Sequence, residues 1–211
     1  MNPATEIRAG QATPADVLRD VAHELRQPLS TIESIAYYLA MVLPRTDERA
    51  QAQLAAIRQL VEQSNWILTS ALGLAGSTPV SERADVDFEE LITQAAASLA
   101  GPDRPCVRLA LAGALPSVHL DPVQGRELAE SLLMLARQLS VRGDVTVSTS
   151  APASGGAEAI LTAPGHGNYP ASGTGSTLGL ENARRIAEIH GGTLELEATP
   201  ETGIRLRVML P

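Results

Sequence analysis

Apolar residues recur at alternating intervals of three and four positions along the first part of the chain. The positions are Leu18, Val21, Leu25, Pro28, Ile32, Ile35, Leu39 and Val42. This spacing is the heptad seam of a long amphipathic helix. Thr13 is placed to cap the helix, with Pro14 at its first position, and Pro44 ends the pattern.

A second run repeats the same spacing after a short turn. Thr46 is placed to cap this helix, whose seam positions are Leu54, Ile57, Val61, Ser64, Leu68, Ala71 and Ala75. Two helices of matched length joined by so short a turn are predicted to lie antiparallel. Because a lone hairpin leaves half of each seam in water, we expect a second copy to complete a dimeric four-helix bundle. This domain is residues 13–76, preceded by a disordered tail at 1–12.

The pattern changes after a linker of small and polar residues, from Gly76 to Arg83. A second domain, residues 84–211, mixes both periodicities. We expect helices at 88–99, 122–139 and 180–190, strands at 107–112, 117–120, 145–150, 157–161, 193–198 and 204–210, and a glycine-rich loop at 164–177. The chain is therefore predicted to be α+β, with an α/β sandwich following the helical hairpin.

Composition narrows the classes of function. The formal charge is -8 and all 16 basic residues are arginine, so the concentrated basic face that binds nucleic acid is not expected. No apolar run approaches the roughly 20 residues of a membrane span, and no signal segment is recognisable, so we expect a cytoplasmic protein that does not bind membranes. Cys106 is the single cysteine, which excludes an intrachain disulfide and a cysteine metal cluster.

His23 is the candidate for chemistry. It lies on the face of the first helix opposite the seam, where it is expected to be exposed. A neutral imidazole has one nitrogen free to attack a phosphoryl group when an acceptor orients the other nitrogen. Glu24 is the candidate acceptor or base, and Gln27, one turn away, is a candidate for orienting water. The other three histidines show no metal-ligand spacing, so no metal site is expected.

The segment His-Glu-Leu-Arg-Gln-Pro-Leu, from His23 to Leu29, resembles the H box of sensor histidine kinases. The helical hairpin resembles their dimerisation and phosphotransfer domain. The chain from Leu178 through Gly191-Gly192 to Pro211 is similar to the last glycine box, helix and hairpin of the Bergerat-type ATPase domain of that family. The resemblance implies that His23 is the phosphoacceptor and that response-regulator receiver domains are the partners.

The first ATP-binding motif of that family is incomplete. When Asp121-Pro122 is laid on the start of the family's N box, Ser131 and Leu135 stand at the two asparagine positions. The resemblance implies that the second position helps to hold Mg²⁺, a cation that needs oxygen ligands. Leu135 offers none.

The glycine motifs are also altered. Ala163 replaces the aspartate that precedes two spaced glycines, Gly165 and Gly167. The final glycine box keeps Gly175 and Gly179, with Thr177 at a position where a missing Cβ lets backbone amides approach phosphate. The segment that would cover the phosphates is short.

These losses favour a protein that uses no cofactor. Phosphoryl transfer from ATP needs a cation to neutralise developing charge, so little or no autokinase activity is expected. The first hypothesis is a histidine phosphotransferase, in which His23 exchanges a phosphoryl group with receiver aspartates. An active kinase that holds ATP and Mg²⁺ through atypical residues is an alternative. A non-catalytic pseudokinase scaffold is another.

Overall fold

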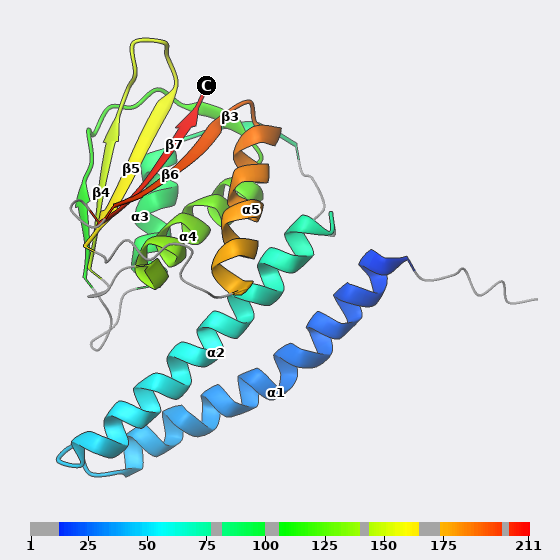
Figure 1. Cartoon of the computed structure of the whole chain (residues 1–211), viewed down its shortest axis with the longest axis vertical. Coiled ribbons are helices and arrows are strands. Elements are labelled where there is room, and N and C mark those ends of the chain that lie inside the picture. The colour runs from blue at the N-terminus through cyan, green and yellow to red at the C-terminus, as the bar shows by residue number, and fades with distance from the viewer. Residues whose placement is uncertain (1–12, 77–81, 100–105, 140–143, 165–173, 200–202) are drawn as a thin grey trace, which may run out of the picture.

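The computed structural model describes residues 13–76, 82–99, 106–139, 144–164, 174–199 and 203–211. The expected tail at 1–12 and most of the expected glycine-rich loop lie outside these residues. Figure 1 shows a long helical hairpin and, beside the upper part of its second helix, a domain of sheet and helices. The fold is α+β, as predicted from the sequence.

The hairpin consists of α1 (Pro14–Val42) and α2 (Glu48–Leu74). Thr13 caps α1 in a capping box, because its hydroxyl accepts from the Asp16 amide and the Asp16 carboxylate accepts from the Thr13 amide. The cap of α2 is Asp47, not Thr46 as the sequence suggested. The Asp47 carboxylate accepts from the amide nitrogen of Ala50 at 3.0 Å, which satisfies a free donor of the first turn.

α2 packs against a stripe of mostly small residues on α1. The stripe has heptad spacing and consists of Ala15, Ala22, Leu29, Ala36 and Leu43, which are all buried or half-buried. The apolar seam recognised in the sequence lies beside this stripe and stays largely uncovered in a single chain. Ile32 and Ile35, for example, are 44% and 54% exposed. The seam is therefore not the contact between the two helices of one chain.

The second domain is built on a five-stranded sheet. Its elements are β1 (Ala84–Val86), α3 (Phe88–Ser98), β2 (Val107–Ala110), β3 (Val118–Leu120), α4 (Pro122–Leu139), β4 (Val145–Ser150), β5 (Ala157–Ala163), α5 (Thr174–Ile189), β6 (Thr193–Thr199) and β7 (Gly203–Leu210). The strand order is β2-β4-β5-β7-β6, and every pair is antiparallel except the parallel pair β2-β4. β1 and β3 form a separate antiparallel pair.

Helices α3, α4 and α5 lie on one side of the sheet (Figure 1). The core between the two layers is formed by apolar side chains of the helices and the inward positions of the strands, including Phe88, Leu132, Leu135, Val147 and Leu206. Two elements differ from expectation. β1 was not predicted, and α5 begins at Thr174 rather than Leu180. At α5, glycines and small polar residues in the first turns hide the helix from periodicity arguments, whereas β1 is too short to show alternation.

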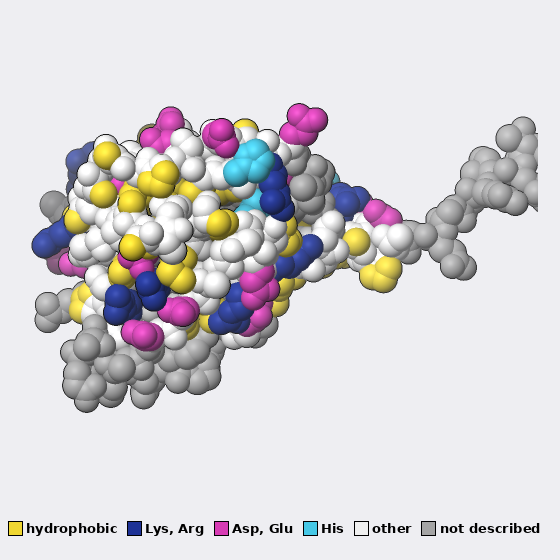
Figure 2. All heavy atoms as spheres, turned by 90° about the horizontal axis from the view of Figure 1, so that it is seen from above, with side chains coloured by type: hydrophobic (Ala, Val, Ile, Leu, Met, Phe, Trp, Pro, Cys, Tyr) yellow, Lys and Arg dark blue, Asp and Glu magenta, His cyan; other side chains and the backbone are white. Residues whose placement is uncertain are grey.

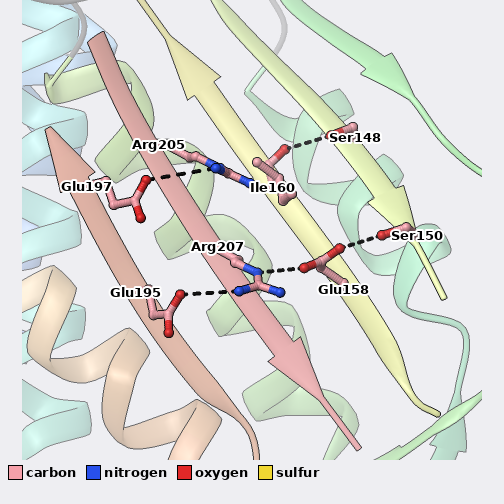
Figure 3. A network of polar contacts seen from close by, with 8 residues as sticks. All are labelled: Ser148, Ser150, Glu158, Ile160, Glu195, Glu197, Arg205 and Arg207. Atoms are coloured by element: carbon pink, nitrogen blue, oxygen red, sulfur yellow. Dashed lines mark hydrogen bonds and ion pairs between the residues drawn. The ribbon is translucent and has the colours of Figure 1, made fainter. Parts of the chain in front are cut away.

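The other face of the sheet carries ion pairs that join neighbouring strands (Figure 3). Arg207 pairs with Glu158 at 2.6 Å and with Glu195 at 3.5 Å, so one guanidinium links three strands. The Ser150 hydroxyl donates to Glu158 at 2.5 Å. The Ser150 hydrogen bond, together with Arg207, lowers the pKa of Glu158 below its ordinary value.

Charges of both signs are interspersed on the molecular surface seen in Figure 2, and no extended basic area gathers on this face. This distribution gives no support there for backbone binding of nucleic acid. Among the described residues, no helix combines the length and apolar character that crossing a membrane requires.

Candidate functional site

The groove beside His23 is formed by one face of α1. His23 is exposed, as its heptad position predicts, and it lines an open groove of about 510 Å³ with Arg26, Gln27, Ser30, Thr31 and Ser34. All six residues come from consecutive turns of a single helix, so the hydrogen bonds of the helix backbone fix their order along the groove. We call this surface the His23 groove.

Hydroxyl side chains make most of the groove uncharged. Thr31 donates to the carbonyl oxygen of Gln27 at 3.1 Å, and Ser34 donates to the carbonyl oxygen of Ser30 at 2.9 Å. These bonds satisfy the hydroxyl donors within the helix itself. Arg26 is the permanently charged residue among the six, so the end of the groove near His23 favours an anionic group.

The sequence predictions for Glu24 and Gln27 have different outcomes in geometry. Gln27 lines the His23 groove, one turn from the imidazole. Glu24 is exposed and is not among the groove residues. Within the described part of the chain, neither side chain is hydrogen-bonded to His23. The roles of Glu24 as acceptor or base and of Gln27 in orienting water therefore stay predictions.

Arg26 is the site residue that sequence reasoning missed. Its Nη2 donates to the Thr69 hydroxyl of α2 at 3.0 Å, which ties the turn of His23 to the second helix. Its position three residues after His23 was visible in the sequence and places it on a neighbouring part of the helix surface. Its hydrogen-bond partner Thr69, 43 positions away, could not be recognised from the sequence.

Three of the positions that the resemblance assigns to the ATP site are buried in the described part of the chain. Leu135 is fully buried and, with Ala163, belongs to the hydrophobic core. Ser131 is also buried, at 2% exposure. A side chain that completes an apolar core has no oxygen to offer and no space beside it for Mg²⁺. Leu135 and Ala163 therefore do not fit the role of holding ATP with its metal.

The glycines of the ATP-site motifs differ in their surroundings. Gly165 and Gly167 lie outside the described residues, and Gly175 lies in the first turn of α5. Thr177 is exposed. Gly179 is buried, and a Cβ there would overlap the ring of Trp66, which projects from α2. The surface of α5 at Gly179 therefore packs against the Trp66 indole of the same chain.

A half-buried carboxylate lies between α4 and α5. Glu127 accepts a hydrogen bond from Asn182 Nδ2 at 2.7 Å. Burial raises the pKa of Glu127, and the hydrogen bond from Asn182 opposes this effect in part. Burial likewise raises the pKa of Glu130 on the same helix, opposed by the charge of Arg126.

The remaining described histidines have structural surroundings. His190 is buried, with Nδ1 2.8 Å from the carbonyl oxygen of Ile186, and its Nε2 accepts from the amide of Asp121 at 3.1 Å. It therefore caps the end of α5 and joins it to the start of α4. His119 lies 3.0 Å from Asp85 across the β1-β3 pair, with both side chains exposed. In the described residues, no group of three or more His, Cys, Asp or Glu is arranged to hold a metal ion.

Sensor histidine kinases are among the known proteins with similar sequences and folds. No sequence-family model matches the chain. The sensor histidine kinase ZraS of Escherichia coli O157:H7 is 27% identical over 207 residues, which cover 90% of this chain and 44% of ZraS. The alginate biosynthesis sensor protein KinB of Pseudomonas aeruginosa is 24% identical over 233 residues, which cover 98% of this chain and 38% of KinB. These similarities support the histidine kinase superfamily for this chain.

Solved structures of histidine kinases share the fold. Full-length ShkA in complex with AMPPNP has a TM-score of 0.61 at 20% identity, and the match covers 94% of this chain and 46% of ShkA. The chain thus spans less than half the length of ZraS, KinB and ShkA. The shared fold is a helical hairpin followed by an ATPase-like domain with a mixed sheet.

Proposed function

We propose that this chain is a phosphorelay protein that carries a phosphoryl group on His23 and exchanges it with aspartates of response-regulator receiver domains. The observation that supports this most is a contrast between the two domains. His23 is exposed in an open groove, whereas Leu135 and Ala163 lie in a closed apolar core. The phosphoacceptor surface is open to a partner protein, and the nucleotide positions are used for packing.

The transfer needs no nucleotide. One imidazole nitrogen of His23 attacks the phosphorus of an aspartyl phosphate, a nitrogen–phosphorus bond forms, and the bond from phosphorus to the aspartate oxygen breaks. The aspartate leaves as a carboxylate, and the same step in reverse phosphorylates a second receiver. The resemblance implies that receivers bring their own Mg²⁺, so Leu135 does not obstruct the step. Docking in the groove supplies the alignment that a bimolecular reaction in water lacks.

We also propose that the chain acts as a homodimer. The seam of α1 leaves Val21, Leu25, Ile32, Ile35 and Val42 between 44% and 54% exposed. A second hairpin that packs on these residues buries them and completes a four-helix bundle. His23 lies on the opposite face of α1, so the dimer leaves the groove accessible.

Labelling experiments test the relay. Receivers encoded in the same genome are phosphorylated with a labelled small-molecule donor and mixed with the wild-type chain, His23→Gln or His119→Gln. The matched control His119→Gln removes an exposed histidine of the β1-β3 pair. Acid-labile label is expected on the wild type and the control but not on His23→Gln. If no receiver labels the wild type, the relay is refuted and the non-catalytic scaffold is the remaining hypothesis. Label from Mg-ATP alone would establish an active kinase.

A further inference from the structure

One turn of α2 contacts both the His23 groove and the ATPase-like domain. Thr69 accepts the hydrogen bond from Arg26 of α1 at 3.0 Å. Its neighbours Ser70 and Gly73 are buried, and Gly73 contacts α5. A displacement of this turn toward or away from α5 therefore moves the partner of Arg26 as well.

The fit between α2 and α5 is close in two places. A Cβ on Gly73 would overlap the side-chain amide of Asn182, and a Cβ on Gly179 would overlap the Trp66 ring. Each helix thus supplies a glycine that makes room for a larger side chain of the other. Interdigitated packing of this kind has few alternative arrangements, because a shift opens a void or produces a clash. We call this pair of contacts the glycine latch.

Polar contacts reinforce the latch. Arg185 of α5 donates to the carbonyl oxygen of Gly73. Glu62 of α2 pairs with Arg137 of α4 at 3.7 Å, and both side chains are mostly sheltered from water. α2 is therefore attached to two helices of the ATPase-like domain.

Arg26 is well placed to contact a transferred phosphoryl group. In the described part of the chain its guanidinium makes the bond to Thr69 and no ion pair with a carboxylate. A guanidinium has five N–H donors, so most of them remain available to phosphate oxygens. A free arginine side chain loses rotamer entropy when it is immobilised, and the anchor on Thr69 removes part of that cost beforehand.

We propose that the ATPase-like domain positions the phosphotransfer site. α5 holds α2 through the glycine latch, α2 holds Arg26 through Thr69, and Arg26 stays beside His23 to receive the phosphoryl oxygens. Gly179, Gly73, Trp66 and Thr69 are positioning residues in this chain of contacts. The inference rests on the proposed phosphotransfer at His23 and gives the ATPase-like domain a role that requires no nucleotide.

The test uses full-length variants and three measurements. Gly179→Val opens the latch, and Glu188→Val places a valine on the exposed surface of the same helix as a control. Emission of Trp66, the single tryptophan, reports the latch. The NMR signal of the His23 ring C–H, assigned with His23→Gln, reports its surroundings. Phosphoramidate reports transfer: its phosphorus–nitrogen bond breaks, ammonia leaves, and the phosphoryl group bonds to His23.

Gly179→Val is expected to shift Trp66 emission to the red, move the His23 signal and slow labelling by about tenfold or more, as misplacement at a reacting centre does. Glu188→Val is expected to behave as the wild type. Thr69→Val is expected to move the His23 signal and slow labelling without changing Trp66 emission. Thr69→Ser keeps the hydroxyl and is expected to restore the His23 signal and the labelling rate. In an Arg26→Ala background, Gly179→Val is expected to add no further loss.

A red shift in Gly179→Val with an unchanged His23 signal would overturn the positioning role. So would an additive loss in the Arg26→Ala background. If the wild type takes no label from phosphoramidate or any receiver, the proposed function fails. The His23 signal in Gly179→Val and Thr69→Val still decides whether α5 controls the surroundings of His23.

Discussion

The resemblance to sensor histidine kinases aligns Leu135 with a metal-binding asparagine, and the structure predicts the effect of an asparagine at this position. Leu135 is fully buried in the core. Losing most of a buried leucine costs about 2–5 kcal/mol, and an unpartnered buried amide costs about 1–3 kcal/mol. Because the asparagine fills part of the cavity, we expect Leu135→Asn to destabilise the domain by about 3–5 kcal/mol. That is a large part of the 5–15 kcal/mol typical of a domain.

Urea unfolding followed by circular dichroism measures this loss. With about 1–3 kcal/mol per molar urea, the midpoint should fall by more than about 1 M at an unchanged slope. Val123→Asn is the matched control, because Val123 lies on the same helix and is 56% exposed. Its free energy of unfolding should change by no more than about 0.5 kcal/mol. A Leu135→Asn protein that is as stable as the wild type and gains affinity for Mg-ATP would refute the reasoning, because position 135 would then line an open cleft.

Four other outcomes are expected. Mg-ATP should not raise the wild-type melting temperature below about millimolar ligand, where binding free energies are near 4 kcal/mol; a micromolar dissociation constant would contradict this. Ile32→Asp should weaken self-association at least about a thousandfold in sedimentation, because each chain places an unpaired charge in the seam, whereas the exposed Gln59→Asp should not. Gln27→Ala should spare transfer to His23 and slow any receiver dephosphorylation, measured as phosphate release. Burial raises the folded-state pKa of Glu127, so the free energy of unfolding should fall as pH rises from the ordinary glutamate range through that raised pKa. Urea midpoints measured across this pH range should show the fall, and Glu127→Gln should remove the part of it that Glu127 contributes.

Much of the fold was predictable because its elements are periodic. The bounds of α4 and β4 agree with the sequence prediction, and α1 begins at the cap read from Thr13. The stripe of Ala22 and Ala36 was overlooked because alanine contributes little to an apolar pattern even where it lets helices approach closely. β1 was overlooked because three residues give no measurable alternation.

The candidate site was likewise predictable only in part. The exposure of His23 follows from its position relative to the seam on one helix, so local geometry sufficed. The bond between Arg26 and Thr69 and the contact between Trp66 and Gly179 join residues far apart in the chain. Such contacts depend on how whole elements pack, and periodicity says which face is buried but not which element covers it.

The small-residue stripe of α1 has a consequence for how the proposed dimer behaves on dilution. Alanines bring α1 close to α2 but bury little apolar area, while the larger side chains of the seam stay exposed until the proposed second chain covers them. Order in α1 is then coupled by mass action to the protein concentration. Amide exchange in α1 should accelerate as the protein is diluted, while exchange in the core strands β5 and β7 should stay slow, because their contacts lie within one chain.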